Sequence, residues 1–220
     1  MPRALTDKEV ADLKARICCE AEKLFAKQGV AGVTMRELAA ALGLSPMAPY
    51  RYFEDRDAIL AAVRASAFSR FSSKLELAFA SGSTPRRRTT AMGKAYLNFA
   101  LKKSDAYRLI FDLTQPDEGK YPELVKQSQR ARNILARQSQ DLMEAGLAPN
   151  DPVLVGYALW AASHGVCVLH LAGKYPSVKD CHKAFEATMR WLFEGFASQL
   201  RREGRVISPT KGTFHANTQA

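Results

Sequence analysis

Residues 45–53, SPMAPYRYF, bring together side chains that are suited to holding a phosphate group. Tyr50 and Tyr52 carry phenol hydroxyls that can donate hydrogen bonds to phosphate oxygens, and Arg51 lies between them. The same spacing would also suit aromatic core residues of a helical hairpin. The choice between the two interpretations depends on the elements that surround the segment.

The residues before the tyrosines mark the start of a short helix. Ser45 is a favoured cap, and Pro46 suits the first helical position, where its missing N–H would have had no partner. Pro49 removes a further N–H that would have bonded the Ser45 carbonyl. We therefore expect a third helix that begins at Ser45 and is stiff at its entry.

Two helices are expected before that segment. Apolar residues recur at helical spacing from Leu13 to Phe25, and Gly29 follows as a stop. In VTMREL, Thr34 with Glu37 predicts a capping box, and Gly43 ends the second helix after about two turns. Two short helices joined by LGL and preceded by a third form a helix-turn-helix, which places a recognition helix in the major groove of DNA.

Composition gives only weak support for DNA binding. The chain of 220 residues has a net charge of +10, but residues 1–60 hold equal numbers of basic and acidic side chains, so the excess lies beyond the motif. The N-terminus lacks the apolar core of a signal peptide, and the cytoplasm is the expected compartment. Four scattered cysteines are a poor layout for a disulfide framework, and we expect reduced thiols.

The stretch TMRELAAALGLSPMAPYRYFEDRDAILAAV resembles the N-terminal DNA-binding region of the tetracycline-repressor (TetR) family of bacterial regulators. The resemblance covers about residues 12–64. It implies an all-α fold of about nine helices, with an N-terminal three-helix helix-turn-helix domain and a larger C-terminal helical domain for dimerisation and ligand binding.

The resemblance also implies roles for single residues. Those expected to contact DNA lie on the second and third helices and directly after them: Thr34, Arg36, Ser45, Pro46, Met47, Ala48, Tyr50, Arg51, Tyr52 and Arg56. The tyrosines would hold phosphates, and Arg56 stands where the family commonly has lysine. The side chains of Pro46, Met47 and Ala48 cannot hydrogen-bond a base edge, so base readout would come from thymine-methyl contacts and from Arg36 or Arg51.

Helical periodicity continues beyond the motif. Asp55 can cap a helix that runs to about Leu77, and after the break ASGSTPRRRTT another begins near Arg86. The remaining expected helices run from Ala106 to Asp112, from Pro122 to a stop at Gly146, from Val153 to Ala172 and from Cys181 to Arg201.

The last two expected helices predict a dimer. Residues 153–172 are almost entirely apolar, but His164, His170 and Ser163 interrupt them, so a buried helix is favoured over a membrane span. Two neighbouring apolar helices from each of two chains would form a four-helix interface. The residues expected there are Val153, Tyr157, Phe185, Met189, Leu192, Phe193 and Phe196.

Trp160, His164 and Gly165 resemble the Trp-x-x-x-His-Gly signature of one C-terminal subgroup of the same family. We expect an effector pocket of mostly apolar lining with one polar group to orient the molecule, formed by Tyr107, Phe111, Trp160, His164 and Cys167. A zinc site is disfavoured because His164 and Cys167 supply at most two of the four ligands that zinc needs. No metal and no cofactor are expected.

The sequence therefore predicts a cytoplasmic, homodimeric repressor that an effector releases from a pseudo-palindromic operator. The expected domains are residues 1–54 for DNA binding, 55–203 for effector binding and dimerisation, and 204–220 as a mobile tail. Catalytic motifs such as G-x-S-x-G, the Walker lysine loop and H-E-x-x-H are missing, which makes an enzyme improbable. The alternative is a helical small-molecule-binding or redox-responsive adaptor that does not bind an operator.

Overall fold

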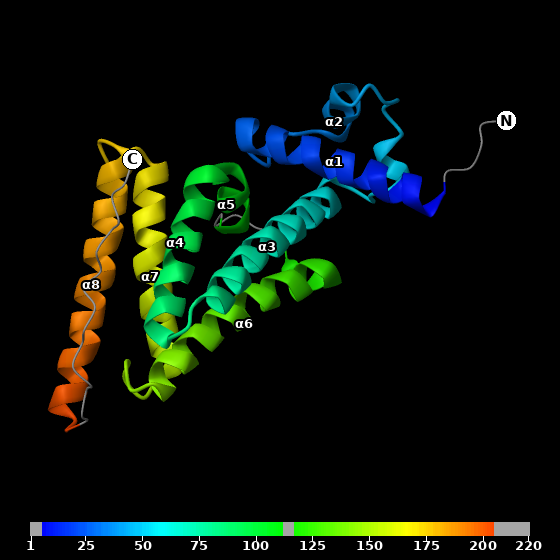
Figure 1. Ribbon diagram of the computed structural model, residues 1–220. Helices are drawn as coiled ribbons and strands as arrows, with labels where there is room; N and C mark the ends of the chain where they lie inside the picture. Colours follow the sequence, from blue (N-terminus) through cyan, green and yellow to red (C-terminus); the bar gives the residue numbers. More distant parts are fainter. Residues whose placement is uncertain (1–5, 112–116, 205–220) are drawn as a thin grey trace. The chain divides into compact units, whose positions relative to one another are not determined.

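The computed structural model describes residues 6–111 and 117–204, and in these residues the chain forms eight α-helices, two short 3-10 helices and no strand (Figure 1). The predicted all-α class is confirmed. In chain order the elements are α1 (Asp7–Gln28), α2 (Met35–Ala41), η1 (Pro49–Arg51), α3 (Arg56–Ser81), α4 (Pro85–Lys102), α5 (Ser104–Phe111), η2 (Glu118–Lys120), α6 (Pro122–Glu144), α7 (Pro152–Leu171) and α8 (Val178–Arg202).

The helices group into two compact units. Unit 1 holds α1, α2, η1, α3 as far as Ser73, α5, η2 and α6 as far as Ala131, and unit 2 holds the end of α3, α4, the rest of α6, α7 and α8. The domain boundary predicted between residues 54 and 55 falls inside unit 1 and stays a prediction about function. Asp112, the expected end of α5, and all of the predicted tail beyond Gly204 lie outside the described residues.

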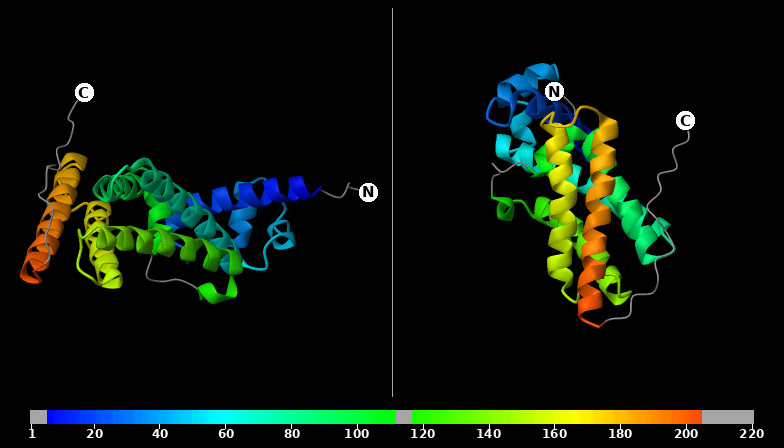
Figure 2. Two further views of the ribbon diagram at one scale, coloured as in Figure 1. Left: turned by 60° about the horizontal axis from the view of Figure 1, so that its bottom comes forward. Right: turned by 90° about the vertical axis from the view of Figure 1, so that its left-hand side faces the viewer.

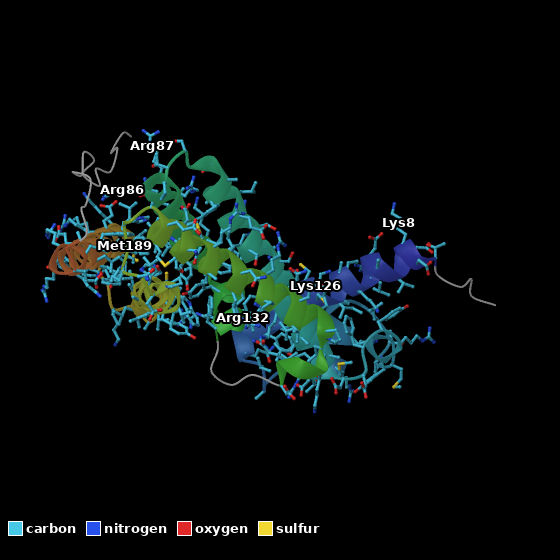
Figure 3. All side chains as sticks on the ribbon, turned by 90° about the horizontal axis from the view of Figure 1, so that it is seen from below. Lys8, Arg86, Arg87, Lys126, Arg132 and Met189 are labelled. Atoms are coloured by element: carbon cyan, nitrogen blue, oxygen red, sulfur yellow. The ribbon has the colours of Figure 1, made fainter. Side chains whose placement is uncertain are left out.

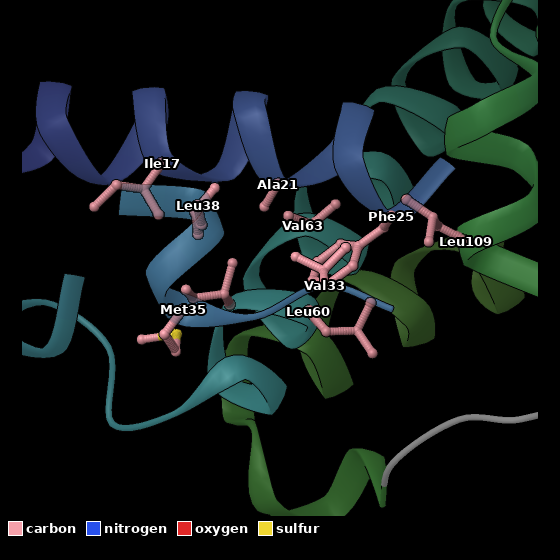
Figure 4. Close-up of a cluster of buried hydrophobic side chains, with 10 residues drawn as sticks. Ile17, Ala21, Phe25, Val33, Met35, Leu38, Leu60, Val63 and Leu109 are labelled. Atoms are coloured by element: carbon pink, nitrogen blue, oxygen red, sulfur yellow. The ribbon is translucent and has the colours of Figure 1, made fainter. Parts of the chain in front are cut away.

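Unit 1 is organised around one apolar core, drawn in Figure 4. Ile17, Ala21 and Phe25 of α1 repeat at helical spacing and are 0 to 2% exposed, which confirms the predicted buried face of this helix. Leu38 of α2 and Leu109 of α5 join the same cluster. Residues far apart in sequence thereby fix the position of the short helix α2.

The helix starts in unit 1 are capped, though not as predicted at each one. Thr34 Oγ1 accepts a hydrogen bond from the Glu37 N–H at 3.1 Å, as predicted, but the Glu37 carboxylate accepts a hydrogen bond from Gln28 Nε2. The predicted capping box at α2 therefore has only one of its two halves. A full capping box joins Thr6 and Glu9 at the start of α1, where none was predicted.

A buried arginine connects four elements of unit 1. Arg64 of α3 is 2% exposed, and its Nη2 lies 2.6 Å from Glu118 Oε1 of η2. Arg64 Nε also donates to the Leu109 carbonyl at 3.2 Å, and Ser128 of α6 donates to the other Glu118 oxygen at 3.3 Å. A buried charge needs such compensation, because burying it unpaired costs several kcal/mol.

In unit 2, α7 and α8 lie side by side with a short turn between them, as both views in Figure 2 show, and α4 packs against α7. Arg88 of α4 holds both carboxylate oxygens of Asp141 in α6, with its Nε 2.8 Å from Oδ2. Its guanidinium carbon lies 5.3 Å from the centre of the Phe79 ring. This bidentate pair fixes the start of α4 against α6.

Three further helix signals predicted from the sequence, at Asp55, Pro122 and Gly146, are confirmed. Asp55 Oδ1 accepts a hydrogen bond from the Ala58 N–H at 2.7 Å at the start of α3, which ends at Ser81 rather than near Leu77. Pro122 opens α6, and Gly146 follows its end with φ +66°, a value that favours glycine.

Candidate nucleic-acid interface and ligand cavity

The turn after α2 is set by a glycine. Gly43 has φ +67°, and its N–H donates to the Ala40 carbonyl at 3.0 Å. The Leu44 N–H donates to the Ala39 carbonyl at 2.9 Å. These two bonds use carbonyls that the helix end leaves unpaired and redirect the chain toward Ser45.

The regular third helix predicted from Ser45 is wrong. Residues 46–48 form a turn, and only Pro49–Arg51 are helical, as the 3-10 helix η1. The Ser45 carbonyl accepts a hydrogen bond from the Ala48 N–H at 2.9 Å, because Pro49 has no N–H to give it. Pro49 instead opens η1, and its own carbonyl accepts from the Tyr52 and Phe53 N–H groups, each at 3.0 Å. The prediction missed that two prolines three residues apart favour consecutive tight turns over an α-helix.

This irregular segment, residues 45–52, is called the recognition turn below. Its Pro49 is buried, whereas Met47 is 66% and Tyr50 is 48% exposed. Most of the other residues predicted to contact DNA are also exposed, and they are Thr34, Arg36, Ser45, Pro46 and Arg51. The chain thus places on the surface a set of donors and apolar groups that can meet a base edge and a phosphate.

Ala48, Tyr52 and Arg56 are more enclosed than the rest of the predicted set. Ala48 is half-buried, and the Tyr52 ring packs on the unit 1 core, so at most its hydroxyl end is available to a ligand. Arg56 Nη1 lies 3.4 Å from the Ala31 carbonyl, and Nη2 lies 3.5 Å from Asp57. Arg56 therefore bridges α3 and the segment before α2, and its predicted contact with DNA would compete with these bonds.

Unit 2 contains a cavity of about 980 Å³, called the α4–α8 cavity below. It is lined mainly by α4, α7 and α8, with Leu75 of α3, Leu135 and Gln138 of α6, and Thr84 and Leu147 outside the helices. Its apolar wall includes Met92 and Tyr96 of α4, Leu159 of α7, and Phe185 and Met189 of α8. A cavity of this size lies near the upper end of the roughly 300–1,000 Å³ found for small-molecule sites.

The predicted effector residues are divided between the two units. Trp160 lines the α4–α8 cavity, and its Nε1 donates to the Tyr96 hydroxyl at 3.2 Å. Tyr107 and Phe111 belong to unit 1, where Phe111 packs edge-on against Phe71 at 5.9 Å between ring centres. Tyr107 is buried there, and Phe111 is half-buried.

His164 and Cys167 follow Trp160 on α7 but are not part of the cavity lining. The His164 ring centre lies 6.2 Å from that of Trp160, and partial burial lowers the pKa of the His164 imidazole below its ordinary 6.5. Cys167 is fully buried. Sequence spacing placed both residues near Trp160, but it did not reveal which part of each turn faces the cavity.

Several lining residues were missed from the sequence. Arg86, Arg87 and Lys94 of α4 and Glu186 of α8 line the α4–α8 cavity, and so does Thr89, which is 5% exposed. Figure 3 labels Arg86 and Arg87 near the start of α4 and Met189 on α8. The spacing of the α4 residues could have indicated that they share one side of the helix. It could not indicate the residues that face them, because those come from helices far along the chain.

The exposed side of α7 is apolar, and α8 also exposes a large apolar residue. Val153, Leu154 and Tyr157 of α7 are 63%, 64% and 61% exposed, and Trp191 of α8 is 63% exposed. The helix from Pro152 to Leu171 contains no charged residue and is long and apolar enough to cross a membrane by length and composition alone. It is less buried within its own chain than predicted, because its partners in unit 2 cover one side of it.

Not every residue predicted for a dimer interface lies on this surface. Phe185, Met189 and Phe196 are 5 to 8% exposed and pack inside unit 2, because they form the face of α8 that is turned to its own chain. They are therefore not part of the interface proposed below. Leu192 and Phe193 are half-buried, and the Phe193 ring meets Phe196 edge-on at 5.7 Å between ring centres.

Two family models match the chain. Residues 17–63 match the model of bacterial regulatory proteins of the tetR family, and residues 89–192 match the model of the tetracyclin repressor-like C-terminal domain. The second match covers Trp160 and His164 but does not identify the Trp-His-Gly subgroup. No curated protein matches the chain.

Solved structures share the fold. A protein of unknown function from Rhodococcus sp. RHA1 is 27% identical, with a TM-score of 0.73 over 84% of this chain and 95% of that one. A tetR-family regulatory protein from Rhodococcus RHA1 is 19% identical (TM-score 0.66, 81% and 96% covered). A TetR/AcrR-family transcriptional regulator from Thermobifida fusca YX-ER1 is 21% identical (TM-score 0.63, 84% and 98% covered).

Proposed function

Because the chain belongs to the tetracycline-repressor family of DNA-binding transcription regulators, which are not enzymes, we propose that it acts as a homodimeric repressor. Each subunit would place its recognition turn in the major groove of a pseudo-palindromic operator. A small, mostly apolar effector would release the DNA. The cytoplasm is the proposed compartment, since that is where such a regulator meets its operator.

The exposed recognition turn is the observation that supports DNA binding most directly. Met47 and Tyr50 extend from a segment with two prolines, and Arg51 follows them at the surface. These three side chains project into solvent from one turn, whose Pro49 is buried. Such a group fits the edge of a base pair and the adjacent phosphates.

The dimer is supported by the uncharged outer side of α7. An apolar surface of this kind on a soluble chain marks a contact with another protein surface. Two copies related by a two-fold axis would bury α7 and α8 of each chain in a four-helix contact. Leu154, Tyr157 and Val168 share this side and are all exposed.

The effector role is proposed for the α4–α8 cavity rather than for the residue set predicted from sequence. Of that set, Trp160 stays in the proposed site, since it is 38% exposed and lines the cavity. His164 and Cys167 do not line the cavity and are not part of the proposed site.

The operator is tested by footprinting. Purified protein is mixed with fragments of its own genome, and bound fragments are sequenced and footprinted. The expected result is a protected site with two half-sites about one helical turn, 10 base pairs, apart or a multiple of that. The double variant Arg36→Ala with Arg51→Ala should lose the footprint, while Lys174→Ala, which removes one exposed positive charge outside unit 1, should keep it.

Failure to select any fragment above background would favour the adaptor without operator binding. Mass spectrometry of the purified protein under native conditions then separates the two parts of the proposal. It reports the number of chains in the particle and the mass of any co-purified small molecule.

A further inference from the structure

We propose that the α4–α8 cavity binds an amphipathic monocarboxylic acid, with the carboxylate held by α4 and the apolar body inside. This inference rests on the proposed function, because it assigns a chemical class to the effector. It is carried by the uneven distribution of charge along the cavity wall.

The cationic groups of the cavity lie on one helix. Arg86, Arg87 and Lys94 all line it, and Arg86 and Lys94 are eight residues apart on α4, which places them on the same face two turns from each other. Arg87 Nη1 is hydrogen-bonded to Ser83 at 3.2 Å. Within the described part of the chain, Arg86 and Lys94 have no ion-pair partner, so their charges are available to a ligand.

The opposite wall carries less charge. On α8, Glu186 is the acidic residue that lines the cavity, and His182 lies one turn before it. The three cations of α4 therefore outnumber the one acidic residue of the lining by two. That excess suits an anion of one or two charges, and an arginine holds a carboxylate with two parallel hydrogen bonds.

A buried hydroxyl on α4 lies close to this positive region in sequence and lines the same cavity. Thr89 is 5% exposed, and among the described residues its Oγ1 has no hydrogen-bond partner. A buried hydroxyl without a partner costs free energy, so its retention is explained if a ligand supplies the acceptor. A carboxylate oxygen is such an acceptor, whereas a hydrocarbon is not.

Beyond these groups the wall is apolar and would take the body of the ligand. Met92, Leu97 and Leu159 are nearly fully buried, and Phe185 and Met189 cover the α8 side. Methionine adapts to chains of different length, because its side chain is unbranched and flexible. The cavity thus combines cations along α4 with an apolar wall, which selects for an amphipath over a small polar acid.

The test compares acids with alcohols of the same chain length. Trp160 lines the cavity, and the second tryptophan, Trp191, is exposed, so Trp191→Phe leaves Trp160 as the single fluorescent reporter. In this background we expect octanoate, decanoate or dodecanoate to change the Trp160 emission. At least one of these acids should bind tenfold or more tightly than its alcohol, in line with about 1.5 kcal/mol or more for a charge-assisted hydrogen bond.

Two variants locate the head group. Replacing Arg86 and Lys94 together by Gln should abolish the preference for acid over alcohol, while Lys174→Gln, which removes an exposed charge that does not line the cavity, should keep it. Thr89→Val should weaken binding of the acid about fivefold without lowering the melting temperature, because it removes a hydroxyl that has no partner in the free protein.

The outcomes test the ligand class separately from the proposed repressor function. If no acid in the series binds more tightly than its alcohol, or if the Arg86 and Lys94 double variant keeps the preference, the carboxylate assignment is wrong. An alcohol that binds the cavity and releases operator DNA would leave the repressor function standing and overturn only the ligand class. An acid that binds with the expected preference but does not release DNA would support the ligand class and count against the proposed function.

Discussion

The recognition turn of unit 1 and the outer side of α7 in unit 2 both expose apolar side chains, yet they are suited to different partners. In the turn, the exposed Met47 is followed along the chain by Tyr50, Arg51 and Tyr52. On α7, the exposed residues Leu154 and Tyr157 belong to a helix without any charged residue. The first surface can stay wet and can pair with phosphates, whereas the second gains free energy only when another apolar surface covers it.

The two surfaces are also held in place in different ways. The turn is fixed locally by Gly43, by two prolines and by backbone hydrogen bonds within ten residues. The α7 surface is fixed by the packing of its opposite side, where Val155, Leu159 and Val166 are buried. A substitution on α7 therefore acts mainly on assembly, and a substitution in the turn acts mainly on the contact with DNA.

The largest effect is expected from Tyr157→Arg. Two symmetric copies of this change would place charges in the proposed apolar contact, and the dimer should weaken by about 4 kcal/mol or more, on the order of a thousandfold in the dissociation constant. Light scattering should report a monomer with a normal helical circular dichroism spectrum. The contrasting variant is Phe196→Asp, which should unfold unit 2 because Phe196 is buried within its own chain. A folded Tyr157→Arg dimer would remove α7 from the interface.

Arg51→Ala tests the turn itself. The loss of a bidentate or phosphate contact should weaken operator binding by about 1–3 kcal/mol while the protein stays dimeric. Fluorescence anisotropy on operator and random DNA would show which kind of contact is lost. Equal weakening on both DNAs indicates phosphate, and a loss confined to the operator indicates base readout. Unchanged affinity for both would exclude Arg51 from the interface.

Tyr50→Phe and Tyr52→Phe compare two positions of the same turn. Tyr50 is 48% exposed, whereas Tyr52 packs on the core, so removal of the Tyr50 hydroxyl should cost about 1 kcal/mol of DNA affinity and removal of the Tyr52 hydroxyl less. The same anisotropy titration measures both variants. A larger loss for Tyr52 would mean that its enclosed hydroxyl is the better positioned donor, contrary to this expectation.

The smallest effect concerns pH. Burial lowers the pKa of His164 in the folded protein below its ordinary 6.5, so between these two pKa values the unfolded chain binds more protons than the folded one. The free energy of unfolding should therefore show no loss from His164 above pH 6.5. It should fall as the pH drops through 6.5 toward the lower pKa of the folded state. Urea unfolding at pH 7.5 and pH 5.5 should show a smaller difference for His164→Gln than for the natural protein. An equal difference would assign the pH dependence to other groups.

Local signals in the sequence predicted the helices well but predicted the cavity poorly. Thr34, Asp55 and Gly146 mark helix ends through bonds or backbone angles within four residues, so their effect can be inferred from spacing alone. The α4–α8 cavity joins residues about one hundred positions apart, such as Thr89 and Met189. The period within a helix indicates which of its faces is buried, but not which other helix of the chain packs against that face.

The failure at the recognition turn has a different cause. Ser45 and Pro46 are correct start signals, but the second proline, Pro49, removes a hydrogen-bond donor from the first turn, and Ala48 bonds the Ser45 carbonyl in its place. Start signals alone do not show that a second proline in the first turn favours a tight turn over an α-helix.

The two prolines of the turn also affect what happens when DNA arrives. Each proline fixes its own φ near −65° and restricts the backbone conformations that the residue before it can adopt. The segment therefore has little conformational entropy left to lose on binding. A recognition turn that is rigid in this way cannot change its conformation to fit a DNA site that matches imperfectly. On an operator the double helix must supply the adjustment, so the flexibility of base steps that the protein never touches becomes part of the sequence it selects.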